Sequence, residues 1–304
     1  MMKGQAMHTI ESVIKRIAEQ FHEADIAFAH GTDNAVDEAA YLVFGALNLD
    51  HDNAAEVYQM NVNELNVDII DKLVEQRIKT KLPVAYLINQ AWFAGLQFFV
   101  DQRVLIPRSP IAELINNQFN PWLDINSKQY VLDLGTGSGC IAIAMAAHFP
   151  NMKVDAIDYS QAALEVAAMN IQRHHLSERV RLIESDFFKK LANNKAQYQY
   201  DLIISNPPYV DKDEISMMSS EFHHEPLIGL ASGDDGLDAV NVIIKESSDY
   251  LSKDGVLIVE VGNSQWALEE KYPNLPFIWI EFEMGGNGVF LLTKEDLDHH
   301  NETS

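Results

Sequence analysis

Residues 130–148 read YVLDLGTGSGCIAIAMAAH, which is an apolar run, a turn with three glycines and a second apolar run. The first run has the length and composition of a buried strand, and the second is long enough for a helix. Glycines between a strand and a helix permit a tight turn and let a ligand lie against the backbone. The segment therefore predicts a strand over Tyr130–Leu134, a ligand-binding turn and a helix over Cys140–His148.

The same alternation continues along the chain. Apolar runs at residues 154–158, 180–184, 200–205 and 256–261 predict further strands. Strands that alternate with helices predict a parallel sheet and an α/β fold. One intervening helix is predicted to begin at Ser160. Another has helical spacing of its apolar residues, namely Leu237, Val240, Ile243, Ile244 and Leu251.

The C-terminal part shows a different pattern. Residues 277–281 and 289–292 flank Gly-Gly-Asn-Gly without room for a helix, so we expect two antiparallel strands. The polar end, residues 296–304, is expected to be a mobile tail.

The N-terminal part has helical periodicity. Apolar residues recur at helical spacing after Thr9, a candidate cap, after Asn34, and up to the break at Pro83. Aromatic-rich runs around Gly95, including Ala-Tyr-Leu-Ile at 85–88, then predict short strands and a turn.

These patterns divide the chain into three parts. We expect a helical domain at residues 1–82, a β-hairpin linker at 83–108 and an α/β domain at 109–304. At the start of the third part, Ser109 is a candidate cap and Pro110 the first residue of a helix.

The composition indicates a soluble globular protein. Of 304 residues, 47% are hydrophobic and 22% charged, which excludes disordered, collagen-like and disulfide-scaffold classes. Charged residues interrupt the early apolar positions, and no apolar run approaches the roughly 18 residues of a membrane span, so neither a signal peptide nor a membrane partner is expected. Cys140 is the only cysteine, so a cytoplasmic location fits best.

The charge balance bears on partners. The chain has 22 Lys and Arg against 45 Asp and Glu, a net charge of -23. Such a surface repels a phosphate backbone, so direct nucleic-acid specificity is not expected. A basic protein partner would be attracted.

Carboxylates accompany three successive predicted strands. Asp133 lies at the end of the first strand, Asp158 closes the second, and Asp186 closes the third. The carboxyl ends of parallel strands share the edge at which open α/β sheets bind ligands, and a carboxylate after the second strand suits a ribose diol. The sequence therefore predicts a cofactor site at this edge.

The glycine spacing distinguishes between cofactors. A dinucleotide fingerprint places the third glycine three residues after the second, whereas Gly135, Gly137 and Gly139 alternate with Thr136 and Ser138. The preceding acid, Asp133, opposes a pyrophosphate and favours a cation. S-adenosylmethionine carries a sulfonium and an ammonium and lacks phosphate, so we expect it as the cofactor, bound by these residues.

The predicted strand at 200–205 runs directly into Asn206-Pro207-Pro208-Tyr209. The prolines fix the backbone and lack N–H groups, so carbonyl groups face the site, and Asn206 adds a side-chain carbonyl. Converging acceptors suit an NH2 group, either the amide of a glutamine or the exocyclic amine of a base, with Tyr209 stacked on it. We predict that these four residues carry the catalysis by alignment and electrostatic stabilisation.

With these motifs the chain resembles the class I methyltransferases of the glutamine-N5 family, whose members modify translation proteins. The resemblance spans nearly the whole chain. It implies a Rossmann-like, mostly parallel seven-stranded sheet with an antiparallel last strand and a small N-terminal helical domain. It also implies cofactor contacts from Gly135 to Gly139, Asp158 and Phe187, and binding of the target glutamine by Asn206 to Tyr209.

Two segments resemble one branch of that family. Release-factor members typically carry Pro-Arg-Pro-Asp-Thr-Glu, whereas residues 107–115 read PRSPIAELI and residues 260–265 read EVGNSQ. Both resemble the branch that methylates large-subunit ribosomal protein L-three. Phe187 stands where release-factor enzymes often have Trp, which keeps a ring face for adenine but loses the indole donor.

Other interpretations stay open at this point. Release factors are the alternative protein substrate, and a nucleic-acid base amine is a less favoured acceptor because the chain lacks a Lys/Arg-rich run. A noncatalytic binding or assembly factor is opposed by the intact Asn206 to Tyr209 segment. No metal site is expected, since adjacent histidines seldom converge on one ion. Residues 221–226 are either a loop over the substrate or a solvated connector.

Overall fold

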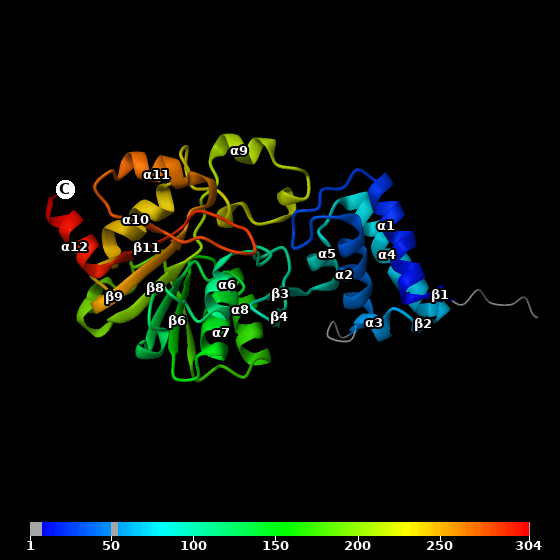
Figure 1. Cartoon of the computed structure of the whole chain (residues 1–304), viewed down its shortest axis with the longest axis horizontal. Helices are drawn as coiled ribbons and strands as arrows, with labels where there is room; N and C mark the ends of the chain where they lie inside the picture. The colour runs from blue at the N-terminus through cyan, green and yellow to red at the C-terminus, as the bar shows by residue number, and fades with distance from the viewer. Residues whose placement is uncertain (1–7, 50–53, 304) are drawn as a thin grey trace, which may run out of the picture. The chain divides into compact units, whose positions relative to one another are not determined.

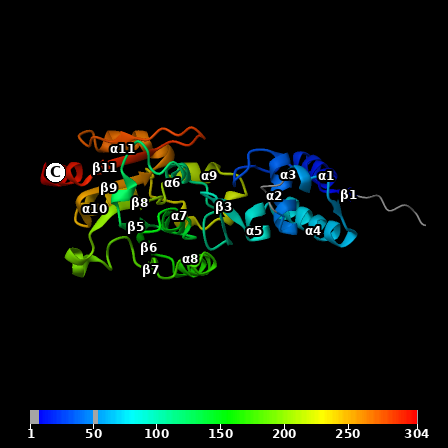
Figure 2. The ribbon, with the colours of Figure 1, turned by 60° about the horizontal axis from the view of Figure 1, so that its bottom comes forward.

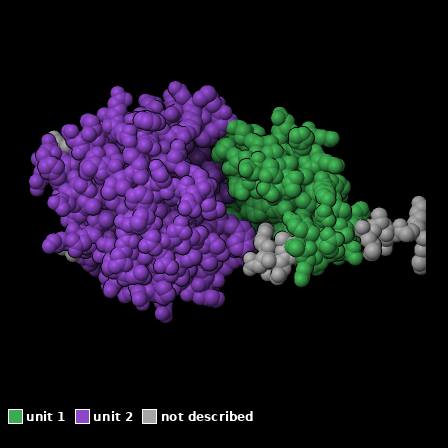
Figure 3. Space-filling view, viewed as in Figure 1, with its two compact units in different colours: residues 1–91, 100–102, 219–224 green, residues 92–99, 103–218, 225–304 purple. Residues whose placement is uncertain are grey.

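The computed structural model describes residues 8–49 and 54–303. The chain forms two compact units, which Figure 3 shows in different colours. Unit 1 comprises residues 1–91, 100–102 and 219–224, and unit 2 comprises residues 92–99, 103–218 and 225–304. Each unit is therefore assembled from segments that are distant in the sequence.

Unit 2 is built on a seven-stranded sheet with the order β10-β11-β9-β8-β5-β6-β7 (Figure 1). Strands β7, β6, β5, β8 and β9 run parallel, whereas β11 is antiparallel to β9 and β10 to β11. The predictions of a mostly parallel sheet and of antiparallel final strands are confirmed. The strands are β5 (Tyr130–Leu134), β6 (Lys153–Asp158), β7 (Val180–Glu184), β8 (Tyr200–Ser205), β9 (Leu251–Glu260), β10 (Ile278–Trp279) and β11 (Val289–Thr293).

Helices cover both faces of this sheet (Figure 1 and Figure 2). The strand order moves one way through β5, β6 and β7 and the other way through β8 and β9, so right-handed crossovers place α7 and α8 on one face and α10 on the other. On the α10 face, Leu132, Leu257 and Ile243 belong to one buried core. The helices are α6 (Ile111–Asn116), α7 (Cys140–His148), α8 (Gln161–Arg173), α9 (Lys212–Met217), α10 (Asp238–Ser247), α11 (Gln265–Lys271) and α12 (Lys294–Thr303).

Strands β5 and β8 are neighbours where the strand order reverses. Leu134 pairs with Ser205, and the Ser205 hydroxyl donates to the Leu134 carbonyl oxygen at 2.7 Å. Open α/β sheets bind ligands at such a reversal, outside the carboxyl ends of the strands. The glycine loop leaves β5 here and Asn206 follows β8, so both segments begin at the same edge of the sheet.

Unit 1 is helical and has its own apolar core. Helix α1 begins after Thr9, whose side chain accepts from the N–H of Ser12, as predicted. Helix α2 begins after Asn34, whose side chain accepts from the N–H groups of Val36 and Asp37. Its elements are β1 (His8–Thr9), α1 (Ile10–Glu23), α2 (Ala35–Leu47), α3 (Ala54–Val57), β2 (Asn61–Val62), α4 (Glu64–Thr80) and α5 (Val84–Ile88).

The segment after Pro83 contains the predicted hairpin but begins with a helix. Strands β3 (Ala91–Phe93) and β4 (Leu96–Phe98) form a two-stranded sheet around Gly95, whose φ is +77°. The strand predicted at residues 85–88 is wrong, because they lie in α5. A short apolar run fits either structure, and Pro83 supplies backbone angles that suit a helix start.

Three further predictions need correction. The polar end is not a mobile tail, since Lys294–Thr303 forms α12 and buries Leu297 in the core; Ser304 lies outside the described residues. Leu251 begins β9 instead of extending the helical face of α10. Helix α6 begins at Ile111, one residue later than predicted; the Ser109 hydroxyl accepts from the Ile111 N–H at 3.1 Å, which is the hydrogen bond expected of the predicted cap. None of the helices among the described residues is long and apolar enough to cross a membrane.

Candidate functional site

The glycine loop between β5 and α7 uses its own N–H groups internally. The N–H groups of Gly135 and Thr136 both donate to the Ile157 carbonyl oxygen, at 2.9 and 2.8 Å. The N–H of Gly137 donates to Asp158 Oδ2 at 2.8 Å, and that of Gly139 to the Thr136 carbonyl oxygen at 2.8 Å. These four donors are therefore not available to hold a phosphate, which is the usual task of such a loop in nucleotide sites.

The three glycines have different tasks, although all have positive φ. A methyl group at Gly137 would meet nothing within 4 Å, and one at Gly135 would lie 4.0 Å from the Asn206 carbonyl oxygen. A methyl group at Gly139 would lie 3.2 Å from Ala167 Cβ on α8. The first two glycines thus keep space open beside the loop, while the third lets α7 pack closely against α8.

Asp133 is completely buried beneath the loop. Its Oδ2 accepts from the Thr136 hydroxyl at 2.6 Å and from the Ala142 N–H at 3.2 Å. Its Oδ1 has no hydrogen-bond partner among the described residues. Burial raises the pKa of Asp133 from 3.8 to about 7. The two hydrogen bonds lower this pKa, and the charge of the neighbouring Asp158 raises it further. A buried acceptor without a partner suits a ligand that brings a donor or a positive charge.

The other two predicted acids differ in their surroundings. Asp158 accepts from Gly137 and from the Ser160 N–H, and burial raises its pKa despite these bonds. Each carboxylate oxygen keeps a lone pair for a further donor. Asp186 instead lies two residues beyond β7 and pairs with Lys189 at 2.5 Å, with both side chains exposed. Phe187 has a φ of +45°, an uncommon conformation for a bulky residue, and is partly buried against the core.

The Asn206 to Tyr209 segment starts directly at the end of β8. Pro207 is buried, and Asn206, Pro208 and Tyr209 are partly exposed. The Tyr209 hydroxyl donates to Glu260 Oε1 at 2.9 Å, and its carbonyl oxygen accepts from the Ser264 hydroxyl at 2.9 Å. Burial and the neighbouring Glu260 raise the pKa of Tyr209, so its hydroxyl keeps its proton. The loop is thus fixed at its far end by residues that follow β9.

Glycines make room for the ring and for the backbone carbonyl group of Tyr209. A methyl group at Gly262 would lie 2.7 Å from Tyr209 Cε2, and one at Gly236 would lie 2.5 Å from the Tyr209 carbonyl oxygen. Both glycines also have positive φ, so other residues would be strained there. Any larger residue at these two positions would displace Tyr209.

Comparison with known proteins identifies the family. A model of the family described as methyltransferase small domain matches residues 117–225. The chain is 46% identical over 292 residues to the ribosomal protein uL3 glutamine methyltransferase of Francisella tularensis subsp. tularensis, a match that covers 96% of this chain and 92% of that protein. It is 44% identical over 295 residues to the protein of the same name in Neisseria meningitidis serogroup A, with 97% and 96% covered. The chain belongs to the ribosomal protein uL3 glutamine methyltransferase family. The resemblance stated from the motifs is confirmed.

Sequence reasoning missed one residue that supports the glycine loop of this methyltransferase. Asn170 on α8 is completely buried. Its Nδ2 donates to the Ser138 carbonyl oxygen at 2.9 Å and to the Phe99 carbonyl oxygen at 3.0 Å, and its Oδ1 accepts from the Phe99 N–H at 2.7 Å. The available signal was an amide side chain on the apolar face of a helix, next to Ile171, because a buried amide needs hydrogen-bond partners.

Glu260 was quoted from the sequence only as a mark of the family branch. It is 4% exposed, and its Oε2 accepts from the Ser109 hydroxyl at 2.5 Å while its Oε1 accepts from Tyr209. Its position at the end of β9, on the ligand-binding edge, was the signal that identifies it as a site residue.

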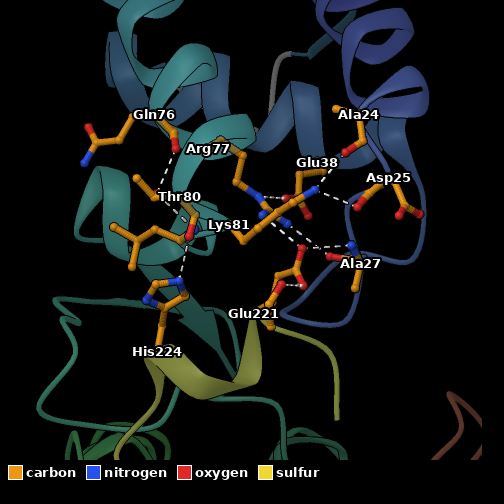
Figure 4. Close-up of polar contacts among 12 residues, drawn as sticks. Ala24, Asp25, Ala27, Glu38, Gln76, Arg77, Thr80, Lys81, Glu221 and His224 are labelled. Carbon is orange, nitrogen blue, oxygen red and sulfur yellow. Dashed lines mark hydrogen bonds and ion pairs between the residues drawn. The ribbon is translucent and has the colours of Figure 1, made fainter. Parts of the chain in front are cut away.

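The segment after α9 is anchored by two buried carboxylates. Glu221, in unit 1, is 2% exposed and accepts from the Ala27 N–H at 3.0 Å, with Arg77 Nη1 at 3.4 Å (Figure 4). Glu225, in unit 2, is 3% exposed and accepts from both Nη atoms of Arg108 at 2.7 Å. The interpretation of residues 221–226 as a solvated connector is wrong for these two side chains.

Proposed function

We propose that this chain transfers the methyl group of S-adenosylmethionine to the side-chain amide nitrogen of a glutamine in ribosomal protein uL3. The observation that carries the proposal is the pairing of β5 with β8, which sets the acidic glycine loop beside Asn206. The glycine loop suits a cationic methyl donor. The segment from Asn206 to Tyr209, called the acceptor loop below, presents hydrogen-bond acceptors to an NH2 group. The names of the relatives, ribosomal protein uL3 glutamine methyltransferase, agree with that acceptor.

The residues of the glycine loop fit S-adenosylmethionine better than a dinucleotide. The loop N–H groups bond within the protein, and the buried carboxylates of Asp133 and Asp158 would repel a pyrophosphate. The unpartnered Oδ1 of Asp133 and the open space at Gly135 and Gly137 suit a cation that approaches the backbone. We assign Gly135 to Gly139, Asp133, Asp158, Asp186 and Phe187 to this cofactor, which supplies a methyl group made electrophilic by a sulfonium.

We propose that the acceptor loop lets the amide nitrogen of the target glutamine react by aligning it with the methyl group. An amide nitrogen is weakly nucleophilic because its lone pair is delocalised into the carbonyl group. The Asn206 side-chain carbonyl and the Pro207 carbonyl would accept the two amide hydrogens, hold the nitrogen in line with the methyl group and stabilise the positive charge that develops. A nitrogen–carbon bond forms as the carbon–sulfur bond breaks, a thioether leaves, and one amide proton then passes to water.

We assign docking of the protein substrate to the helical part, residues 1–82. Helices α1 and α4 border an open groove of about 630 Å³, whose charged lining residues are three acids and two bases, namely Glu23, Asp71, Glu75, Arg16 and Lys79. With the net charge of -23, acidic surface of this kind attracts a basic ribosomal protein. Reversing both charges, Glu23→Lys with Glu75→Lys, should raise the KM for uL3 several-fold and leave the Kd for S-adenosylmethionine unchanged. An unchanged KM would exclude this groove as the docking surface. A cytoplasmic location is part of the same proposal.

The decisive experiment is methyl transfer to competing substrates. The chain is incubated with methyl-labelled S-adenosylmethionine and, in parallel, isolated uL3, a release factor and a ribosomal RNA fragment, and the label is located by mass spectrometry. Label on a uL3 glutamine is expected. Label only on the release factor or on a base amine would overturn the substrate assignment, and label on none would favour a noncatalytic binding protein.

Variants of the same protein test the role of Asn206. Asn206→Ala should lower kcat by at least about a hundredfold, in line with the loss of one electrostatic contact to the reacting group. The Kd for S-adenosylmethionine should remain near that of the unmodified chain. Asn274→Ala, a change at an exposed asparagine of unit 2, is the matched control. Full activity in Asn206→Ala would remove the acceptor role from this residue.

A further inference from the structure

Glu260 joins two segments that are far apart in the sequence. It is the last residue of β9, and its two carboxylate oxygens accept from the hydroxyls of Ser109 and Tyr209, at 2.5 and 2.9 Å. Ser109 lies 151 residues and Tyr209 lies 51 residues away along the chain. The carboxylate therefore links the start of α6, the acceptor loop and the end of β9.

The hydrogen bonds of this cluster have one consistent direction. The Ser109 oxygen accepts from the Ile111 N–H at 3.1 Å, so its own proton is directed at Glu260. The Tyr209 hydroxyl is protonated and donates as well. Two donors facing one carboxyl group require both of its oxygens to accept, which is the property of an ionised carboxylate.

The backbone between Asn206 and Tyr209 is stiff, so the position of Tyr209 affects the position of Asn206. Pro207 and Pro208 have φ fixed by their rings and are the only residues between Asn206 and Tyr209. The ring is held closely by Gly262, and the Tyr209 carbonyl oxygen by Ser264. A shift of the Tyr209 hydroxyl is therefore passed along a stiff segment to Asn206.

We propose that Glu260 is a positioning residue of the transfer reaction, which holds the acceptor loop through the Tyr209 hydroxyl and thereby sets the rate of transfer. The proposal rests on the assignment of Asn206 to the acceptor amide. The side-chain hydrogen bonds of Glu260 within the described part of the chain go to Ser109 and Tyr209, and none goes to the glycine loop. A buried carboxylate at this position lowers folding stability, since burial without a bonded cation disfavours its charge. Its hydrogen bond from Tyr209 explains why the protein has a carboxylate there.

Ionisation of Glu260 provides a distinct signature. Burial raises the pKa of Glu260 from 4.5 to about 7, while the hydrogen bonds from Ser109 and Tyr209 and the charge of Arg108 act against the increase. The hydroxyl oxygen of protonated Glu260 is a poorer acceptor than a carboxylate oxygen, so the hydrogen bond from Ser109 or from Tyr209 is weakened. The loop should therefore be held better as the pH rises through about 7.

The test compares Glu260→Gln with Tyr209→Phe in the full chain. Each should lower kcat about tenfold, the effect of one hydrogen bond lost in the transition state, with the Kd for S-adenosylmethionine unchanged. The double variant should be no worse than either single variant, because both remove the same link. With saturating methyl donor, kcat of the unmodified chain should rise through pH 7, and the Glu260→Gln profile should be flat. Glu270→Gln, at an exposed position on α11, is the control.

A second readout does not depend on turnover. With ¹³C-labelled tyrosine, the Cζ resonance that disappears in Tyr209→Phe belongs to Tyr209, and it should titrate near pH 7 in the unmodified chain and not in Glu260→Gln. A resonance that titrates equally in both, or single-variant losses that multiply in the double variant, would overturn the proposal. If the unmodified chain methylates no uL3 glutamine, the proposed function fails, and the resonance still decides the link between Glu260 and Tyr209.

Discussion

Buried carboxylates are held in different ways in the helical unit and at the site of the α/β unit. In unit 1, Glu38 accepts from Arg77 Nε at 2.7 Å, and Glu221 lies against the same guanidinium (Figure 4). In unit 2, Asp133 and Glu260 are held by hydroxyl and N–H groups. The first arrangement neutralises charge, while the second leaves carboxylates that are costly to ionise. Costly groups of this kind persist where a protein uses them, which agrees with their places beside the donor and acceptor loops.

The largest loss of stability is expected when the buried arginine of unit 1, Arg77, is replaced. Arg77→Met should lower the free energy of unfolding of this unit by about 3–5 kcal/mol, because it leaves Glu38 and Glu221 buried without their partner. Hydrogen exchange in α1, α2 and α4, with urea denaturation of the full chain, measures the loss. Arg16→Met is the matched control, since Arg16 is an exposed arginine of the same unit. If both variants lose equal stability, the buried cluster does not hold unit 1 together.

Much of the fold was predictable because it depends on local patterns. The strands at Tyr130–Leu134, Val180–Glu184 and Tyr200–Ser205 are apolar runs between turn signals, and their predicted bounds are those observed. The adjacency of β5 and β8 is compatible with this alternation, since right-handed crossovers leave few possible strand orders. The sequence alone did not place the glycine loop beside Asn206, because that placement depends on the pairing of β5 with β8.

The parts that were not predictable depend on distant contacts. Helix α12 is polar, and its single buried residue, Leu297, is held by a core whose other members lie far away in the sequence. The acidic segment after α9 carries no local sign that Glu221 meets Arg77, 144 residues distant. The bond from the Ser109 hydroxyl to Glu260 was not predicted, because Glu260 lies on a strand 151 residues away. Propensity and spacing describe neighbours along the chain, whereas these partners are neighbours only in the fold.

A smaller effect is expected from the pH dependence of unit 2. The folded-state pKa of Asp133 is raised, so the folded state binds a proton more tightly than the unfolded chain does. Its contribution to stability is therefore complete below about pH 4 and is lost as the pH rises towards 7, by roughly 1 kcal/mol per pH unit. Glu260 acts in the same direction. Urea denaturation of the full chain, together with amide hydrogen exchange in β5 and β8, should show this decline in stability between pH 5 and pH 7.

Asp133→Asn separates that decline from other titrations. Asparagine does not ionise, so the stability of the variant should fall less steeply over the same pH range, whatever its absolute stability. The contribution of Glu221 to stability depends on pH in the opposite direction. Its pKa is lowered, because the bonds from Ala27 and Ser220 and the charge of Arg77 outweigh the effect of burial, which raises it. Unit 1 should therefore lose stability only as the pH falls below about 4.5. An identical pH slope in Asp133→Asn and in the unmodified chain would contradict a raised pKa at Asp133.

The smallest effect is expected at an exposed ion pair of unit 1, and it tests whether burial is what makes the Arg77 cluster strong. Arg16 Nη2 lies 2.6 Å from Asp71 Oδ1, a shorter separation than that of Arg77 and Glu221, but the side chains are 37% and 46% exposed. Water and salt screen such a pair, so Asp71→Asn should cost less than about 1 kcal/mol, and 0.5 M NaCl should remove most of that cost. The loss in Arg77→Met should change little with salt, because its charges are shielded from ions. A cost at Asp71 equal to that at Arg77 would mean that distance, rather than burial, decides the strength of these pairs.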